Sequence, residues 1–443
     1  MTDGTPSRYE PAGETGPPPR RHNHYNRAGF PLRDAFRPIP AVMEPERRML
    51  VALVAVLLGL GTLMVHSASG TSRPSQLDEI YLSKHLVYAA TGVLAACLAA
   101  ALPARTWYRI APPFFAITIV LLVLVLIPGV GSSVKGARRW FRVAGLSFQP
   151  SELAKLAIPL MVGLLAQKNR ALLANWRRGV LPVVYPLMVA VPLIMKQPDL
   201  GTSLFVLVGG GLTLFLSGWP LRYFVAGASV AIPAVVLVVL NKSYQLRRVH
   251  DFLATWSDWT QAPWHLKQSL VTLAAGGIWG TGIGRGQQKL SFLPEANTDF
   301  IFAVIGEELG LVGAVAVLGI WLLLYGCGLR LINRLPAGSY ESIVATTLLT
   351  QVLLQAAINV AVVTALVPPK GIPHPLLSYG GTNLVVTLLS LGIVLSLTRP
   401  AQAPVAGPAP PDRTNPPLTP TPRTDLDLVP ARDLPLPVSP ANG

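Results

Sequence analysis

One stretch of the sequence decides the fold class: residues Phe300–Cys327, FIFAVIGEELGLVGAVAVLGIWLLLYGC. This stretch is long and apolar enough to cross a hydrocarbon core of about 30 Å as a helix. Its only charged residues are Glu307 and Glu308, which are costly in lipid and are expected to face the protein interior. The stretch therefore predicts a membrane-spanning helix with one polar face.

Other apolar stretches of the same kind predict an all-α polytopic membrane protein with about ten transmembrane helices. They are Leu50–Val65, His85–Leu102, Ile110–Ile127, Glu152–Leu165, Val180–Met195, Leu200–Leu216, Tyr223–Leu240, Ser342–Val367 and Leu384–Leu397. The stretches that begin at Glu152 and Leu200 are short for a bilayer, so we expect tilted, short or broken helices there.

The composition also indicates a membrane protein. Of the 443 residues, 51% are hydrophobic and only 13% are charged, whereas a soluble domain has about 25% charged residues. The net charge of +15 does not indicate nucleic-acid binding, because many positive charges lie between apolar stretches and the sequence has no basic helix or aromatic–basic platform. Cys97 and Cys327 both fall within apolar stretches, where packing is expected and not a disulfide or a metal site.

The two ends of the chain differ from its middle. Residues 1–46 are rich in Pro, Arg and Gly, and residues 400–443 are dominated by Pro, Thr and Asp. Neither segment has apolar periodicity, so both are predicted to be disordered tails. The transmembrane domain is assigned to residues 47–399.

Basic residues in the short connections indicate the orientation. One side of the predicted domain carries Arg47, Arg48, Arg105, Arg109, Lys168, Arg170, Arg177, Arg178, Arg222, Arg330 and Arg334. By the positive-inside rule this side is the cytoplasm, so both termini are predicted to be cytoplasmic. The segments 128–151, 241–299 and 368–383 are then outside. The second of these, between spans seven and eight, is long enough to suggest a function.

The outer segment KGARRWFR, residues 135–142, opposes this charge rule. Four basic residues of this segment lie close to two predicted spans: Lys135, Arg138, Arg139 and Arg142. Solvated charges are common in long outer loops, but they explain positive charge so close to two spans less well. Arginine forks suit phosphate oxygens, and Trp140 can lie at the level of the lipid headgroups. The cluster therefore predicts an anion site for a diphosphate-linked lipid, with solvated loop charges as the alternative.

Two other sites place charged residues at the ends of predicted spans. Glu152 and Lys155 are three residues apart and share one helical face. They predict either a functional pair inside the membrane or a structural ion pair between helices. Asp199, in the sequence KQPDLGT, lies at a break between two spans, where it is predicted either to line a cavity or to cap the following helix.

Asp299 lies where the long outer loop enters an apolar span. Desolvation at such a junction raises the pKa of a carboxylate, which suits a general base. Aspartate is also a good N-cap residue. The residues alone leave the general base and the helix cap as equal alternatives.

Five motifs in this region resemble the SEDS family, which comprises FtsW, RodA and a sporulation homologue. They are KGARRW (135–140), QPSELAK (149–155), QPDLGT (197–202), the segment from LPE to ELG (293–310) and PLLSYGG (375–381). The resemblance runs from about Met49 to Arg399 and leaves out the tails. The residues Glu295-Ala and GEELG (306–310), together with the long tails, resemble the division branch of the family more than the RodA branch.

The resemblance implies a metal-dependent peptidoglycan glycosyltransferase of the bacterial inner membrane. Such an enzyme uses lipid II as donor and acceptor, needs a divalent cation such as Mg²⁺ or Mn²⁺, and works with a class B penicillin-binding protein and other division or elongation proteins. The resemblance assigns the catalytic acid to Asp299 and places Glu152 and Lys155 on the central cavity. Asn297 stands where the family commonly has His, which puts in doubt a role for an imidazole beside Asp299.

The substrate-binding residues predicted from these observations are Lys135, Arg138, Arg139, Trp140, Arg142, Glu152, Lys155, Asp199, Lys370 and Ser378. Two other functions fit parts of the same pattern. A lipid II transporter also suits a broken span and intramembrane charges, although it needs no titratable acid beside an outer anion site. A scaffold that recruits partners through its tails predicts that Asp299 is dispensable.

Overall fold

The protein is described by a computed structural model that covers most of the predicted membrane domain. The described residues are 44–69, 76–134, 136–143, 145–172, 175–241, 246, 250, 252–253, 255–256, 258, 260, 262–290, 293–369 and 371–399. Both predicted tails lie outside them, apart from residues 44–46. Lys135 and Lys370, which were predicted to bind substrate, also lie outside the described residues.

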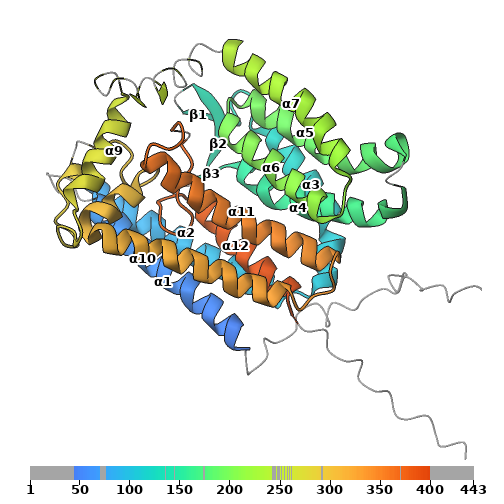
Figure 1. The fold of residues 1–443 in the computed structure, drawn as a ribbon, viewed down its shortest axis with the longest axis horizontal. Coiled ribbons are helices and arrows are strands. Elements are labelled where there is room, and N and C mark those ends of the chain that lie inside the picture. The colour runs from blue at the N-terminus through green and yellow to red at the C-terminus, as the bar shows by residue number, and fades with distance from the viewer. Residues whose placement is uncertain are drawn as a thin grey trace, which may run out of the picture. The chain divides into compact units, whose positions relative to one another are not determined.

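The described chain is mainly helical (Figure 1). The long helices are α1 (Pro45–Ser69), α2 (Gln76–Ala101), α3 (Ala104–Leu124), α4 (Pro150–Lys168), α5 (Leu181–Lys196), α6 (Leu200–Leu216), α7 (Leu221–Asn241), α9 (Trp264–Ala275), α10 (Ile301–Ile332), α11 (Tyr340–Val363) and α12 (Thr382–Leu397). Short 3-10 or π turns are η2 (Arg170–Leu172), η3 (Trp176–Val180) and η5 (Gln288–Leu290). Each predicted span overlaps one of the long helices, so the prediction of a helical membrane fold is confirmed.

Among the described residues, 6 helices are long and apolar enough to cross a membrane. They are α1, α2 from Tyr81, α3, the segment Arg177–Lys196 that contains α5, α10 and α11. The helices α6 and α12 are apolar but have only 17 and 16 residues, and α4 carries Glu152, Lys155 and Lys168. The total of about ten spans stays a prediction.

The all-α prediction omits a small sheet in the outer segment 128–151. The strands β1 (Ser132–Val134), β2 (Ala137–Val143) and β3 (Leu146–Phe148) form an antiparallel sheet in the order β1-β2-β3. Gly136 and Gly145 stand at the two turns with positive φ values of 80° and 76°, which glycine adopts without strain. Two tight turns return the chain on itself, so the basic segment forms a strand and not an extended loop.

Helix packing brings distant parts of the sequence together. The helix α12 packs along α2, α1 packs against α10, and α4 lies among α3, α6 and α11. The connection between α11 and α12 enters this core, because a β-carbon on Gly61 of α1 would lie 2.2 Å from the carbonyl oxygen of Leu376. Only a glycine allows the two backbones to approach so closely. The connection between α11 and α12 is therefore positioned by α1 as well as by the two helices that it joins.

The first residues of α1 differ from the predicted disordered tail. The helix begins at Pro45, and Glu46 stands in its first turn, where the fixed φ of proline and a negative charge both favour a helix. Glu44 and Glu46 each form an ion pair with Arg334 near the end of α10. These pairs join α1 to α10 at the end of the domain that is predicted to be cytoplasmic.

Candidate functional site

Glu152 and Lys155 form the predicted pair on the first turns of α4. The Lys155 Nζ atom lies 2.8 Å from Oε1 of Glu152 and 2.9 Å from its Oε2, and both residues are buried. The ammonium group also lies 5.0 Å from the centre of the Phe205 ring on α6. The prediction of a shared helical face is confirmed.

Two amide side chains from other helices complete this pair. Asn383, in the first turn of α12, donates to Oε2 of Glu152 at 2.7 Å. Gln355 of α11 accepts from Lys155 at 3.1 Å and donates to Oδ1 of Asn383 at 3.1 Å. Three helices therefore share one closed polar network, which we call the α4 pair network and define as Glu152, Lys155, Gln355 and Asn383.

Asp199 caps α6 and also reaches the small sheet. Its Oδ1 accepts from the backbone N–H of Thr202 at 3.1 Å, so the predicted helix cap is observed. Its Oδ2 accepts from Gln149 at 2.9 Å and lies 3.5 Å from a guanidinium nitrogen of Arg139. The same carboxylate is thus both a helix cap and the partner of a predicted phosphate ligand.

The segment that carries Asp299 is held by hydrogen bonds that neighbouring residues donate to its backbone carbonyl oxygens. Asn359 of α11 donates from Nδ2 to the carbonyl oxygen of Asp299 at 2.8 Å and to that of Ile372 at 2.9 Å. The Tyr379 N–H donates to the carbonyl oxygen of Asn297 at 2.8 Å. Asp299 itself is half-buried and stands one position before Phe300, the N-cap residue of α10. It is therefore one residue too early to be the N-cap of this helix.

Ser378 was predicted to contact substrate, and the structure places it against the backbone of the segment that carries Asp299. Its buried hydroxyl donates to the carbonyl oxygen of Thr298 and accepts from the N–H of His374 at 2.8 Å. Burial raises the pKa of the neighbouring Tyr379 to about 12, so its phenol stays protonated at neutral pH. The contacts of Ser378 support the loop that holds Asp299.

The basic residues of β2 have different surroundings. Arg139 lies 3.5 Å from Oδ2 of Asp199, at a point where the register between β1 and β2 shifts and the alternation of side chains is disturbed. Arg138 is half-buried and donates to the carbonyl oxygen of Leu126 at 3.5 Å, Trp140 is half-buried, and Arg142 is exposed. The cluster is therefore not one uniform patch: Arg139 pairs with a buried carboxylate, whereas Arg142 faces solvent.

Glu307 and Glu308 are buried, as predicted, and the carboxylates are held by a separate set of groups. Glu308 forms an ion pair with the buried Lys289 and accepts from Ser67 of α1 at 2.7 Å and from the Gly284 N–H at 3.0 Å. Glu307 accepts from the N–H groups of Gln287 and Gln288 at 2.8 and 3.2 Å. We call Ser67, Lys289 and Glu308 the α10 pair network.

Hydrogen bonds, with one step between the chain neighbours Thr382 and Asn383, connect the predicted residues. The Gln149 N–H donates to Thr382 Oγ1 at 3.0 Å, beside Asn383, and Gln355 donates to the carbonyl oxygen of Pro373 at 2.9 Å. The cationic sheet, Asp199, the α4 pair network and the loop that supports Asp299 are thus parts of one polar path. The residues that sequence reasoning missed are Gln355, Asn359 and Asn383. Gln351, Gln355 and Asn359 recur every four residues in an apolar span, and that spacing could have identified a polar helix face.

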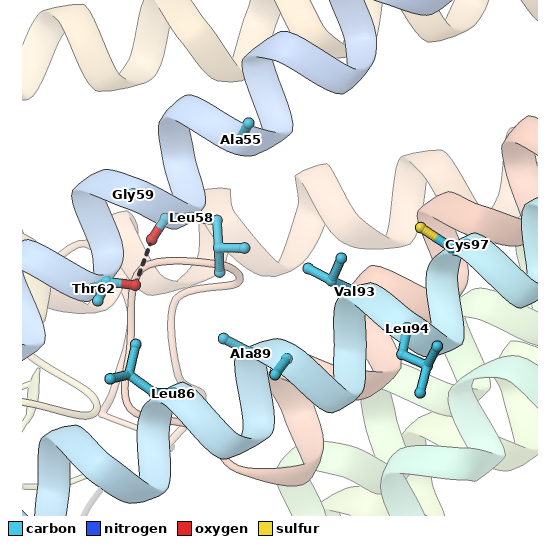
Figure 2. Close-up of a pocket in the computed structure, with 10 residues that line it drawn as sticks. Ala55, Leu58, Gly59, Thr62, Leu86, Ala89, Val93, Leu94 and Cys97 are labelled. Carbon is cyan, nitrogen blue, oxygen red and sulfur yellow. Dashed lines mark hydrogen bonds between the residues drawn. The ribbon is translucent and has the colours of Figure 1, made fainter.

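An apolar groove lies between α1 and α2 (Figure 2). Its volume is about 840 Å³, and its lining consists of Ala55, Leu58, Gly59, Thr62, Leu86, Ala89, Ala90, Val93, Leu94 and Cys97. Leu86 follows His85, whose ring lies 6.3 Å from that of Tyr379. One end of the groove therefore approaches the loop that supports Asp299.

Among the described residues, no group of three or more His, Cys, Asp and Glu side chains could hold a metal ion. A Mg²⁺ ion commonly binds through one or two carboxylates and substrate phosphates, and it keeps several waters. Such an ion does not require a cage of protein ligands.

The chain is similar in sequence and in fold to several known proteins. A relative from Trichlorobacter lovleyi, named probable peptidoglycan glycosyltransferase FtsW, is 36% identical over 352 residues, which are 79% of this chain and 92% of the relative. A chain in "Structural coordination of polymerization and crosslinking by a peptidoglycan synthase complex" matches with a TM-score of 0.63 and 31% identity, covering 79% of this chain and 96% of that one. The rod shape determining protein RodA of Thermus thermophilus matches with a TM-score of 0.56 and 29% identity, covering 79% and 95% of the two chains.

A family model described as cell cycle protein, for FtsW, RodA and SpoVE, matches residues 47–403. This match spans the whole transmembrane domain assigned from the sequence, including all five motifs. The chain is a multi-pass membrane protein that belongs to the FtsW/RodA/SpoVE family.

Proposed function

We propose that the protein polymerises the glycan strands of peptidoglycan, with lipid II as both donor and acceptor. The observation that carries this proposal is the polar path from the cationic sheet to Asp299. An acid at one end and accessible arginines at the other match the two needs of glycosyl transfer from a lipid diphosphate.

In the proposed reaction, a sugar hydroxyl of the acceptor attacks the anomeric carbon of the donor. The new glycosidic C–O bond forms as the bond between that carbon and the diphosphate oxygen breaks, with inversion at carbon. Asp299 takes the hydroxyl proton as general base, and the diphosphate leaves with the bonding electron pair. A single base suffices for one in-line displacement, unlike the paired carboxylates of hydrolases.

The leaving diphosphate gains negative charge and needs fixed cations. We assign this role to Arg138 and Arg142, with Lys135 and Lys370 as further candidates and Trp140 at the headgroup level. Arg139 and Asp199 contribute by fixing the sheet against α6. A divalent cation, Mg²⁺ or Mn²⁺, would add positive charge at the diphosphate.

The α4 pair network is proposed to line the substrate cavity. Its charged Lys155 is two hydrogen bonds from the loop that supports Asp299, through Gln355 and the carbonyl oxygen of Pro373. The groove between α1 and α2 offers an apolar surface for a polyprenyl chain, and one end of it approaches the same loop. The orientation proposed from basic residues puts Asp299 and the sheet on the outer face and both termini in the cytoplasm. A class B penicillin-binding protein and other division or elongation proteins are the proposed partners.

The central test replaces Asp299 by Asn. Asparagine retains the size and capping ability of aspartate but cannot accept the proton, so glycan polymerisation should be abolished in purified protein supplied with lipid II. Folding is checked by the thermal unfolding midpoint, which should match that of the unmodified protein. Full activity of Asp299→Asn would remove the catalytic assignment.

A second test replaces Arg138 and Arg142 by Ala, with Arg139→Ala as a separate control. Removal of the accessible pair should raise the lipid II concentration needed for half-maximal rate and reduce the salt sensitivity of what remains. Arg139→Ala should mainly lower stability, because its partner is the helix cap Asp199. An unchanged concentration dependence in the double variant would exclude the diphosphate site.

A transporter of lipid II is the second candidate, because buried charges in a helical bundle also suit transport. The two functions separate when lipid II is supplied to the outer face of liposomes. A polymerase converts this lipid II to glycan chains without translocation, whereas a transporter only moves it between leaflets.

A further inference from the structure

The hairpin 276–286, which follows α9, is inserted into the hydrogen-bond ladder of α10. In an uninterrupted helix the N–H groups of residues 311 and 312 donate to the carbonyl groups of residues 307 and 308. Gly310, with φ 71°, interrupts α10 at this point. The hairpin supplies the replacement bonds: Thr281 N–H to Glu307 O at 2.9 Å, Gly282 N–H to Glu308 O at 3.0 Å, Leu311 N–H to Gly277 O at 2.9 Å and Val312 N–H to Ile278 O at 3.2 Å.

Two glycines allow this insertion. A β-carbon on Gly280 would lie 2.3 Å from the carbonyl oxygen of Glu308, and one on Gly310 would lie 2.4 Å from the Gly280 nitrogen. The two backbones are therefore in direct contact. Irregular backbone is tolerated at membrane depth only where its polar groups are satisfied, and these four bonds satisfy both the hairpin and the interrupted helix.

The segment that contains α9 and the hairpin lies beside the first turns of α10 (Figure 1). At the start of α9, the ring of His265 lies 6.2 Å from that of Phe300. At its end, Leu273 covers Gly306. The return toward Asp299 is fixed by the ion pair of Lys289 with Glu308. The described residues 264–290 and 293–299 thus run toward Gly310 and return to Asp299.

The length of α10 indicates how deep in the membrane the hairpin meets Gly310. The helix has 32 residues, which is more than a hydrocarbon core requires. The segment from Leu311 to Arg330 contains about 20 residues and rises about 30 Å, which matches the core thickness. The exposed apolar face begins with Leu311, at 59% exposure, and continues with Val315 and Leu322. The hairpin therefore meets α10 at the boundary of the hydrocarbon.

The side chains at the tip suit that boundary. Trp279 is 81% exposed, Ile278 is 59% exposed, and Ile283 and Arg285 are also exposed. A tryptophan combines a large apolar ring with a hydrogen-bond donor, which favours the zone between headgroups and acyl chains. Arg285 can reach lipid phosphates from the same position.

We propose that the hairpin 276–286 is an interfacial anchor whose tip, Ile278 and Trp279, inserts into the lipid leaflet on the Asp299 side of the membrane. We assign this surface to the zone between lipid headgroups and acyl chains, since the exposed tip continues the exposed apolar face of α10 at Leu311 and Val315. That leaflet is the outer one in the orientation proposed above, and on this point the inference rests on the proposed function. The anchor would fix the height of the returning segment that carries Asp299.

The test is a depth measurement that does not depend on catalysis. A spin label is attached at Trp279→Cys in a Cys97→Ala, Cys327→Ala chain reconstituted into liposomes. Its collision rates with oxygen, which partitions into lipid, and with a water-soluble nickel chelate are then measured. Leu322→Cys on the exposed face of α10 is the deep control, and Gln287→Cys, exposed on the returning leg, is the water control. Ile278→Cys serves as the tip position if the Trp279 variant does not fold.

The expected result is an oxygen-to-nickel collision ratio at residue 279 that is several-fold higher than at residue 287 and lower than at residue 322. A ratio equal to that of residue 287 would place the tip in water and overturn the proposal. Exclusion of both reagents would also overturn it, because it would indicate a protein partner on this surface. An inactive polymerase with the expected ratios would leave the anchor intact and count only against the proposed function.

Discussion

Among the described residues of the membrane domain, two buried lysine–glutamate pairs differ in what surrounds them. In the α4 pair network, the charged groups are three residues apart on one helix, and side-chain amides from α11 and α12 complete their contacts. In the α10 pair network, Lys289 comes from the segment that follows the hairpin, and Glu308 is completed by Ser67 and a backbone N–H. The first pair joins the polar path to Asp299, whereas the second fastens a loop to two helices. Similar chemistry is therefore proposed to serve substrate binding in one place and to hold the structure together in the other.

The largest effect on stability and polymerisation is expected for variants of the α4 pair. Glu152→Gln or Lys155→Met alone strands a buried charge, which costs about 3–5 kcal/mol of folding free energy. The double variant removes both charges, so its thermal stability should recover while polymerisation from lipid II stays absent. A double variant that is both stable and active would make this pair structural and would remove the contrast between the two networks.

The α10 pair should differ from the α4 pair in the activity of its double variant. Lys289→Met alone should again cost about 3–5 kcal/mol, since Glu308 would lose its cation. The double variant Lys289→Met with Glu308→Gln should recover both thermal stability and polymerisation, because no substrate role is assigned to these groups. Thermal unfolding and lipid II turnover on the two variants are the measurements. Stability without activity in the double variant would assign a functional role to the second network as well.

A smaller effect is expected for the amide that links the first network to the catalytic loop. Gln355→Met removes the donor to Pro373 and the acceptor of Lys155, which should cost about 1–3 kcal/mol and reduce turnover by weakening the support of Asp299. Gln351→Met, one helical turn earlier on the same face, is the matched control. Its amide nitrogen has no hydrogen-bond partner among the described residues, so the change should be nearly neutral. Equal effects of the two substitutions would mean that the link through Gln355 has no special part in the site.

The sequence predicted what depends on local patterns. Apolar length predicted the helices, the spacing of Glu152 and Lys155 predicted their pairing, and the cost of charge in lipid predicted the burial of Glu307 and Glu308. The sequence did not predict contacts that depend on how distant segments fold together. Lys289 is separated from Glu308 by an irregular segment, and Asn359 meets the backbone of Asp299 only because α11 packs beside it. The sheet was missed because its strands are short, and their turns depend on Gly136 and Gly145.

The exchange of backbone bonds at Gly310 has a consequence for local unfolding. If the hairpin detached, the N–H groups of Leu311 and Val312 and the carbonyl groups of Glu307 and Glu308 would lose their hydrogen-bond partners together. The hairpin and the first turns of α10 must therefore open as one cooperative unit, although Thr281 and Glu307 are 26 residues apart in the sequence. Amide hydrogen exchange should accordingly be equally slow at Thr281, Gly282, Leu311 and Val312 and should accelerate at all four when the Lys289 contact is removed.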